Sequence, residues 1–296
     1  MKSAFVIGGT GLVGRALVDA LIADGVHVIG LARNAAAIIE LREAGVETLP
    51  TDLVGAWTWA DEIAEAEVVF HAGLPRQRPP LRHIGARRRA REAAAAATAL
   101  ADLVGDRPLV VAGSALVYGD RPSEPADEAA ALDPLPAALP AAAAEAALRE
   151  TALRIVRLPW VYGPGGWFRD LVVGLRTRRY RIVGDGHNRW GLLGVDDAVA
   201  ALRAVAEADP GVYNAIEAAP TQDDVVNSIC RAPGFHRPDR TPRAIASIPL
   251  GGAMARSLSA SVWTTDDRLR GTGWAPTGAW EPALRELTEI SLPASV

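Results

Sequence analysis

The chain has 296 residues, of which 49% are hydrophobic and 22% are charged, and its formal net charge at pH 7 is −4. This composition excludes disordered and fibrous proteins and is typical of a globular chain with one large domain or two small ones. The single cysteine, Cys230, excludes a disulfide framework and a cysteine-rich zinc site, and we predict no metal ligands. The acidic balance argues against a nucleic-acid partner, and no apolar stretch is long enough for a signal peptide or a membrane span. We therefore expect a cytoplasmic protein that acts on a small molecule and has no membrane partner.

The first forty residues predict a strand, a glycine turn, a helix and a second strand. The apolar run 4–7 is followed by the glycine turn 8–14, and apolar residues then recur at helical spacing. Gly8 allows a tight turn, Gly11 lets the backbone approach a pyrophosphate, and Gly14 lets the helix pack closely against the sheet. The amino end of the helix offers free N–H groups to phosphates. The alternative is a glycine-rich turn without a ligand. We predict that the turn binds a dinucleotide through Gly8, Thr10, Gly11, Leu12, Val13 and Gly14.

The second strand, predicted over residues 26–32, ends next to Arg33. A site that prefers NAD carries an acidic residue about 20 residues after the glycines, where it binds the ribose hydroxyls. A guanidinium instead pairs with the 2′-phosphate of NADP, which a carboxylate repels. We therefore predict that NADP(H) is favoured over NAD(H), and a solvated surface arginine is the alternative.

Strand-like and helical segments alternate along the chain. This alternation predicts an α/β fold, with a Rossmann-type doubly wound parallel sheet and a smaller C-terminal substrate-binding lobe. We assign residues 1–160 and 195–215 to the Rossmann domain. The remaining residues of the range 161–296 form the lobe. Ligands of such a sheet bind at the carboxyl ends of its strands. Further strands are expected at 46–49, 68–73, 109–114 and 153–158, helices at 89–104 and 141–153, and a surface loop at 122–140.

Several motifs, in the same order, resemble the short-chain dehydrogenase/reductase superfamily in its extended or atypical branch, the NAD(P)-dependent epimerase/dehydratase group. The glycine turn matches the Gly-x-x-Gly-x-x-Gly pattern of that family, and the segments 114–119, 157–165 and 184–197 are similar to the segments that surround its active site. The resemblance implies that Ser114 assists catalysis and that the loop after the sixth strand holds the nicotinamide. It implies further cofactor contacts from Asp52, Leu53, His71, Ala72, Gly73 and Pro159.

The catalytic pair of this family is missing. Its Tyr-x-x-x-Lys pair is expected in the helix that contains Glu145, where this chain has Ala137 and Ala141. Lys2 is the only lysine of the chain, and no tyrosine lies between positions 118 and 162. In the family, the tyrosine transfers the substrate proton, and the lysine lowers the pKa of that tyrosine and binds the nicotinamide ribose. Loss of a positioned proton donor typically costs ~10²–10⁴-fold in rate, so carbonyl–alcohol interconversion needs another donor.

Three residues are candidates for a rebuilt proton relay. Ser114 ends a predicted strand, where its hydroxyl can bond a substrate oxygen, or it is a turn serine. Tyr118 is more often a packing tyrosine in this family, and an unassisted phenol titrates near ~10. His187 carries an imidazole with an ordinary pKa near ~6.5, or it is a surface histidine. Trp160 and Trp190 are expected to form an aromatic wall for the substrate, or the core of the lobe.

Seven arginines crowd residues 76–91. A solvated helix face or a contact with a partner subunit explains them better than a nucleic-acid site, because no aromatic residues are interleaved. The family resemblance implies a homodimer through the helices that follow the fourth and fifth strands.

The motifs together predict an NADP(H)-dependent oxidoreductase or epimerase that acts on a small-molecule carbonyl or alcohol with a non-standard proton relay. The missing tyrosine and lysine leave two alternatives open. One is an NADP(H)-binding sensor or regulator without catalysis. The other is a non-redox cyclase or dehydratase that uses the cofactor-bound pocket.

Overall fold

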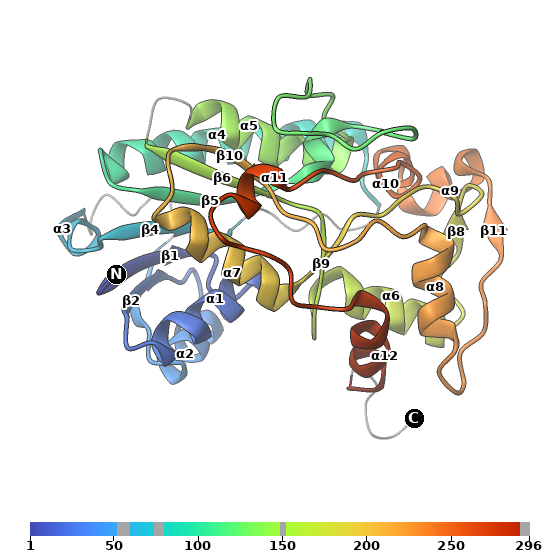
Figure 1. Cartoon of the computed structure of the whole chain (residues 1–296), viewed down its shortest axis with the longest axis horizontal. Coiled ribbons are helices and arrows are strands. Elements are labelled where there is room, and N and C mark those ends of the chain that lie inside the picture. The colour runs from blue at the N-terminus through green and yellow to red at the C-terminus, as the bar shows by residue number, and fades with distance from the viewer. Residues whose placement is uncertain (52–59, 74–79, 149–151, 291–296) are drawn as a thin grey trace.

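The computed structural model describes residues 1–51, 60–73, 80–148 and 152–290, which include a seven-stranded sheet (Figure 1). The strand order is β10-β6-β5-β4-β1-β2-β3, and every neighbouring pair is parallel. This order, with helices on both faces, confirms the predicted Rossmann-type fold. The strands are β1 (Ser3–Ile7), β2 (His27–Leu31), β3 (Glu47–Leu49), β4 (Val68–His71), β5 (Leu109–Ser114), β6 (Leu153–Leu158) and β10 (Gly211–Asn214).

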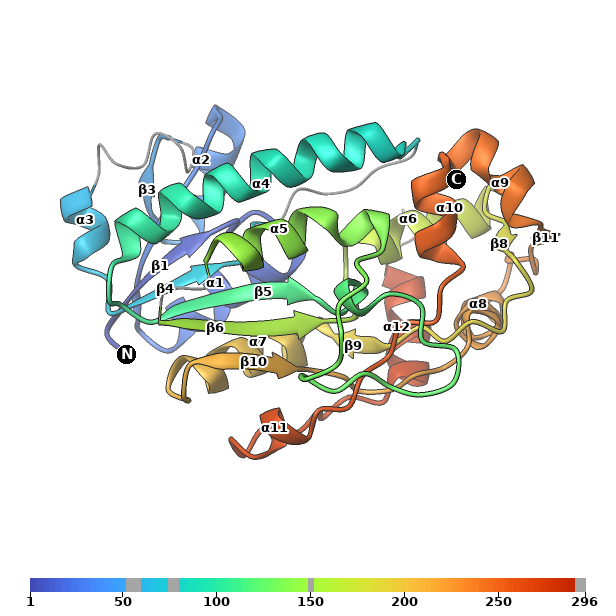
Figure 2. The same cartoon turned by 90° about the horizontal axis from the view of Figure 1, so that it is seen from above.

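Each face of the sheet has its own core, because alternate strand residues point to opposite faces. On one face, Val6 and Val110 join the cluster that packs against the helices α1 (Leu12–Ala23), α2 (Ala35–Glu43) and α7 (Val195–Ala206). On the other face, Phe5 and Val111 pack against α3 (Ala60–Ala64), α4 (His83–Val104) and α5 (Leu139–Ala147). Figure 2 shows α4 and α5 side by side on one side of the sheet and α7 on the other. The homodimer expected through α4 and α5 stays a prediction.

The rest of the chain, apart from the short helix α11 (Asp267–Arg270), packs at the carboxyl ends of the main strands (Figure 1), whereas α11 lies beside β10. This remaining part contains two small parallel sheets and a core of its own around Phe168, Val225 and Ile229. The division of the chain at residue 160 stays a prediction. No described helix has both the length and the hydropathy needed to cross a membrane. These elements are β7 (Trp160–Tyr162), α6 (Gly166–Arg176), β8 (Ile182–Val183), β9 (Leu192–Gly194), α8 (Gln222–Cys230), β11 (Arg240–Thr241), α9 (Arg243–Leu250), α10 (Gly252–Leu258), α11 (Asp267–Arg270) and α12 (Trp280–Ile290).

Two expected boundaries are wrong. Helix α4 begins at His83 rather than at residue 89, and the expected surface loop 122–140 ends in helix. Residues Pro136–Ala138 form the 3₁₀ helix η3, which leads directly into α5. Pro136 and Pro140 lie in the first turns of η3 and α5, where a missing backbone N–H costs no helical hydrogen bond.

Candidate functional site

The glycine turn is held by backbone packing that leaves no room for side chains. Gly8 has a φ of +86°, and a Cβ on it would lie 2.5 Å from the Cα of Gly73. A Cβ on Gly14 would lie 2.1 Å from the carbonyl oxygen of Gly8. The amide of Gly11 donates to the same oxygen at 2.9 Å and closes the turn. These contacts bring the start of α1 against the end of β1, as a dinucleotide-binding turn requires.

The amino end of α1 is open to a ligand. Gly11 is the N-cap residue and makes no side-chain hydrogen bond to the helix. Thr10 and Gly11 are exposed, and Leu12 and Val13 are half-buried. Within the described part of the chain no side chain caps the first N–H groups of the helix, and with the positive end of the helix dipole they fit the pyrophosphate of a dinucleotide.

Arg33 lies two residues beyond the end of β2 and is exposed. Within the described residues its guanidinium makes no hydrogen bond and no ion pair. The next residue, Asn34, begins α2, because its side-chain oxygen accepts from the amide of Ala37 at 3.0 Å. The guanidinium is thus available for an anion beside the glycine turn. Two of the predicted cofactor contacts, Asp52 and Leu53, lie outside the described residues.

The end of β4 forms the wall behind the glycine turn. The amide of Ala72 donates to the carbonyl oxygen of Ile7 at 2.9 Å, and Gly73 then passes close to Gly8. His71 is buried in the strand, and burial lowers the pKa of its imidazole, which is therefore neutral. His71 thus packs within this wall, and Gly73 allows the end of β4 to approach the glycine turn closely.

The positions of the missing tyrosine and lysine lie in an apolar environment. Ala137 belongs to η3, and its amide donates to the Oγ of Ser257 in α10 at 3.2 Å. Ala141 is buried in α5, in a cluster that also contains Leu116 and half-buried Trp160. Helix α10 thus covers the position expected for the tyrosine, and alanine side chains supply no acid or base there.

Tyr118 is locked in a buried network beneath this region. Its hydroxyl donates to the Oδ1 of Asn214 at 2.8 Å and accepts from an Nη of Arg157 at 2.8 Å. Arg157 is itself paired with Glu145 at 2.9 Å. Burial raises the pKa of the Tyr118 phenol, because the phenolate would lose its solvation. This arrangement favours the packing role of Tyr118, and its role as proton donor stays a prediction.

The other two candidates differ in their placement. Ser114 ends β5, and its Oγ accepts from the amide of Leu116 at 3.3 Å. Because the Ser114 O–H donates to no described residue, it is available for a substrate oxygen at the carboxyl edge of the sheet. His187 lies in an exposed loop between β8 and β9, where its amide donates to Asp185 and its side chain is 71% exposed. The structure does not pair His187 with Ser114.

The aromatic wall is a cluster of three tryptophans. The ring of Trp160 lies 5.4 Å from the ring of Trp167 and 5.4 Å from that of Trp190, between centroids. Trp190 is only 1% exposed, and its indole N–H donates to the carbonyl oxygen of Leu258. Trp190 is therefore part of the core of the lobe, and its ring packs against that of Trp160. Trp160 and Trp167 are half-buried, and Trp160 directly follows Pro159 at the end of β6.

One pair of polar side chains beside the site, Tyr162 and Glu217, was not predicted from the sequence. The hydroxyl of Tyr162 donates to Glu217 at 2.6 Å, and the amide of Gly194 donates to the same carboxyl oxygen at 3.2 Å. Burial raises the pKa of both side chains, and the hydrogen bond raises that of Tyr162 further. Tyr162 lines a cavity of about 690 Å³ that extends along α1 from Thr10. The pair is 55 residues apart in the chain, and β9 brings it together because β9 pairs with β7 and its Leu192 accepts from the amide of Glu217.

Comparison with known proteins gives one family and a large group of similar folds. The model of the NAD-dependent epimerase/dehydratase family matches residues 4–215. A protein of Streptomyces sp., 3-diazoavenalumate denitrifying reductase, is 31% identical over 300 residues, which cover 94% of this chain and 98% of the relative.

Solved structures with this fold include proteins with either coenzyme. The human epimerase family protein SDR39U1 with NADPH has a TM-score of 0.79 and 21% identity, over 97% of this chain and 99% of that one. UDP-glucuronic acid 4-epimerase from Bacillus cereus, in complex with UDP-glucuronic acid and NAD, has a TM-score of 0.80 and 16% identity, over 98% of both chains.

Proposed function

Because this chain belongs to the NAD-dependent epimerase/dehydratase family, we propose that it is an NADPH-dependent reductase that replaces the diazo group of a small aromatic acid with hydrogen. The observation that carries the proposal is the apolar environment of Ala137 and Ala141. Reduction of a carbonyl leaves an alkoxide that must be protonated, and the family residues that serve this step are absent. A substrate whose leaving group departs as a neutral gas needs no such donor.

The reaction balances without an acid. Bound NADPH supplies a hydride, which ends in the new C–H bond of the ring, while the electrons of the broken C–N bond leave with dinitrogen. For an arenediazonium ion the products are then the arene, N₂ and NADP⁺, and no proton is consumed. The task of the protein is to orient the substrate and to exclude water, and positioning alone supplies much of a rate enhancement.

The relative from Streptomyces sp. supports this choice of substrate. Its name assigns it a reductive removal of nitrogen from a diazo compound, and it is similar to this chain over nearly its whole length. The half-buried rings of Trp160 and Trp167 suit a planar, electron-poor ring. The O–H of Ser114, which donates to none of the residues that the structure describes, suits an oxygen substituent of that ring.

Arg33 supports the preference for NADPH. Its guanidinium is exposed and has no partner among the described residues, at the strand end that faces the adenosine of a dinucleotide in a Rossmann fold. No carboxylate lies at this position to bind the ribose hydroxyls or to repel a phosphate.

The test is turnover of an arenediazonium acid, such as diazotised 3-amino-4-hydroxybenzoate, by the full chain with NADPH. We expect NADPH oxidation and N₂ release well above the rate without protein, and deuterium transfer from 4-deuterated NADPH to the ring. The same assay with aldehydes and ketones tests the carbonyl reductase predicted from the sequence. Tight NADPH binding with no turnover of any substrate would overturn the proposal in favour of a sensor. Turnover without a change in NADPH absorbance would overturn it in favour of a cyclase or dehydratase.

A further inference from the structure

Two arginine-rich segments that are far apart in the sequence meet at the end of α6. The first segment, residues 176–181, contains four arginines and leads into β8. Strand β8 pairs in parallel with β11, and the amide of Ile182 donates to the carbonyl oxygen of Asp239 at 3.1 Å. This pairing brings residues 236–240 beside the first segment. A cavity of about 180 Å³, the arginine pocket, lies between the two, and its lining includes Arg178, Tyr180, Arg181, His236, Arg237 and Asp239.

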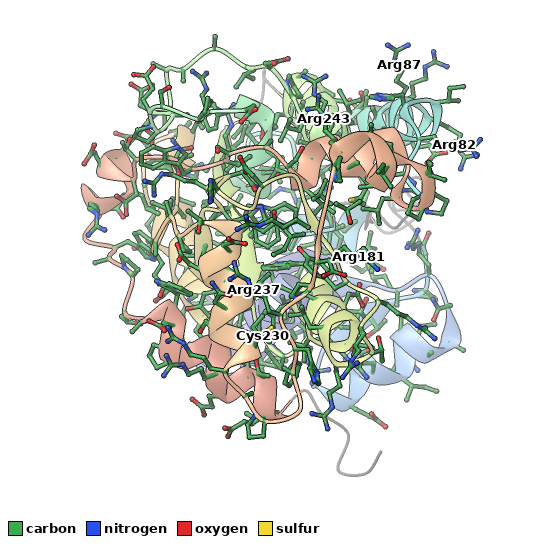
Figure 3. All side chains as sticks on the ribbon, turned by 90° about the vertical axis from the view of Figure 1, so that its right-hand side faces the viewer. Arg82, Arg87, Arg181, Cys230, Arg237 and Arg243 are labelled. Carbon is green, nitrogen blue, oxygen red and sulfur yellow. The ribbon has the colours of Figure 1, made fainter. Side chains whose placement is uncertain are left out.

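The pocket has a fixed base and charged groups that solvent can reach. Leu175, in the last turn of α6, lines the pocket and is 2% exposed. The hydroxyl of Tyr180 accepts from the side-chain amide of Gln222 in α8 at 2.7 Å. The side chains of Arg181 and Arg237 are 57% and 55% exposed, and Figure 3 shows both on the same face of the molecule. A ligand that enters from solvent therefore meets guanidinium groups.

A buried carboxylate holds one of these guanidinium groups in place. Asp223 lies in the first turn of α8, and its side chain is only 12% exposed. It accepts from Arg237 at 2.9 Å, and Arg240 of β11 donates to the same carboxyl oxygen. The other N–H groups of the Arg237 guanidinium have no acceptor among the described residues. Arg237 is thus positioned in advance for a ligand, which lowers the entropic cost of binding.

Arg178 has an unusual backbone conformation for an arginine. Its φ is +58°, and no other residue except glycine has a positive φ in the described ranges. It directly follows the C-cap of α6, where the amide of Arg179 donates to the carbonyl oxygen of Gly174 at 2.8 Å. Glycine is the usual residue at this position, because it has no Cβ to strain. The Arg178 side chain extends to His236, with 2.9 Å between Nη and Nε2, and has no carboxylate partner among the described residues. The backbone strain therefore points to a role for this side chain.

The pocket carries an excess of positive charge, although the whole chain has a net charge of −4. Four guanidinium groups stand against two carboxylates, which are Arg178, Arg181, Arg237 and Arg240 against Asp223 and Asp239. Asp239 pairs with Arg181 at 2.9 Å, but its side chain is 82% exposed, so another anion can displace it at little cost. The excess of two charges matches a phosphate monoester, which carries about −1.5 to −2 charges at pH 7.

We propose that the arginine pocket binds the phosphoryl group of a small phosphorylated molecule. Guanidinium groups from two segments suit an anion with three oxygens, because each oxygen can accept a charge-assisted hydrogen bond. A carboxylate has one charge and two oxygens, so it matches the pocket less well. A cavity of about 180 Å³ admits one phosphoryl group rather than a length of polynucleotide.

The binding test is calorimetric titration of the full chain with glycerol 3-phosphate. NADPH is present at saturation, so that the glycine turn and Arg33 are occupied. Glycerol and acetate are the matched probes without a phosphoryl group. We expect saturable binding of glycerol 3-phosphate at one site, weaker binding at higher salt, and no binding of glycerol.

Substitutions then locate the site. Arg178→Gly removes a guanidinium and supplies the residue that the backbone favours, so we expect at least about tenfold weaker binding without a fall in melting temperature. Asp239→Asn removes the carboxylate that competes for Arg181 and is expected to tighten binding severalfold. Arg179→Gln, at the exposed arginine next to Arg178, is the matched control and is expected to change binding less than about twofold.

Three results would overturn the proposal. They are equal binding by the wild type and Arg178→Gly, equal affinity for acetate and glycerol 3-phosphate, and tighter binding to vesicles of phosphatidic acid than to glycerol 3-phosphate. Because none of the substituted residues belongs to the proposed reaction site, turnover of the diazonium substrate is an independent measurement.

Discussion

The glycine turn and the alanine region at Ala137 and Ala141 lie at the same edge of the sheet but tolerate change very differently. At the turn, one added carbon on Gly14 would lie 2.1 Å from a backbone oxygen. At the alanine region, the contacts are those of side chains such as Ser257 of α10, Leu116 and Trp160. Backbone contacts fix the place expected for the cofactor. Side chains, which can be exchanged without loss of the fold, set the chemistry beside it.

This contrast explains how a chain can keep the family fold and lose its catalytic pair. The tyrosine and lysine of the family project from a helix whose backbone here is stabilised by Glu145 and Arg157, not by the catalytic side chains. Removal of the pair therefore changes the available reactions rather than the architecture.

Gly14→Ala is expected to have the largest effect. The new Cβ must displace the Gly8 carbonyl, so we expect a loss of about 2–3 kcal/mol in the free energy of unfolding. NADPH affinity should fall at least about tenfold, because the N–H groups of the turn move. The matched control is Gly85→Ala in α4, where a Cβ meets nothing within 4 Å and a helical alanine should stabilise. Urea unfolding and calorimetric titration measure both effects, and a Gly14→Ala protein with unchanged values would contradict the backbone argument.

Arg33→Ala tests the coenzyme preference without disturbing the fold. Because the side chain is exposed and unpaired within the described residues, we expect no change in melting temperature. Loss of a charge-assisted hydrogen bond to the 2′-phosphate should weaken NADPH binding by about 10- to 100-fold, with NADH binding unchanged. Arg42→Ala, at an exposed arginine in the last turn of α2, is the control. If Arg33→Ala weakened the binding of NADPH and of NADH equally, the proposed role of Arg33 would be wrong.

The features that sequence predicted are the ones that depend on local pattern. Apolar runs and the glycine spacing located the seven-residue turn and the strands around it, because both follow from short-range geometry. The start of α4 was missed because its first turns carry arginines and an exposed isoleucine rather than an apolar stripe. The start of helix α5, and η3 before it, were missed because Pro136 and Pro140 predicted a loop. In the structure both prolines lie in the first turn of a helix.

The features that sequence did not predict depend on long-range packing. Tyr162 meets Glu217 because β9 pairs with β7 and also bonds the segment of Glu217 through Leu192, and no motif contains Glu217. Burial of Trp190 and the network around Tyr118 likewise require the register of distant strands. Residue type alone therefore made Tyr118 a candidate proton donor. The structure shows that its hydroxyl bonds Asn214 and Arg157.

Tyr118→Phe separates packing from catalysis. The change leaves Asn214 and Arg157 each short of a buried hydrogen-bond partner, so we expect a loss of about 1–3 kcal/mol in stability. Turnover of the best substrate should change far less than the ~10²–10⁴-fold typical of a lost proton donor. Tyr213→Phe, which removes one hydrogen bond to Asp209, is the matched control. A large fall in kcat at unchanged stability would instead assign Tyr118 to the proton relay.

His71 gives the smallest effect and a distinct dependence on pH. Burial lowers the pKa of His71 in the folded protein, whereas the unfolded chain takes up a proton near pH ~6.5. Below that pH the unfolded state binds more protons, so the free energy of unfolding falls as the pH falls, by at most ~1.4 kcal/mol per pH unit from this group. His71→Leu should remove this part of the slope, whatever its effect on stability at neutral pH. His27→Gln, at an exposed histidine, is the control. Urea unfolding over a series of pH values measures how the free energy of unfolding depends on pH. If this dependence were identical for the wild type and for His71→Leu, His71 would not be a buried neutral imidazole in the folded protein.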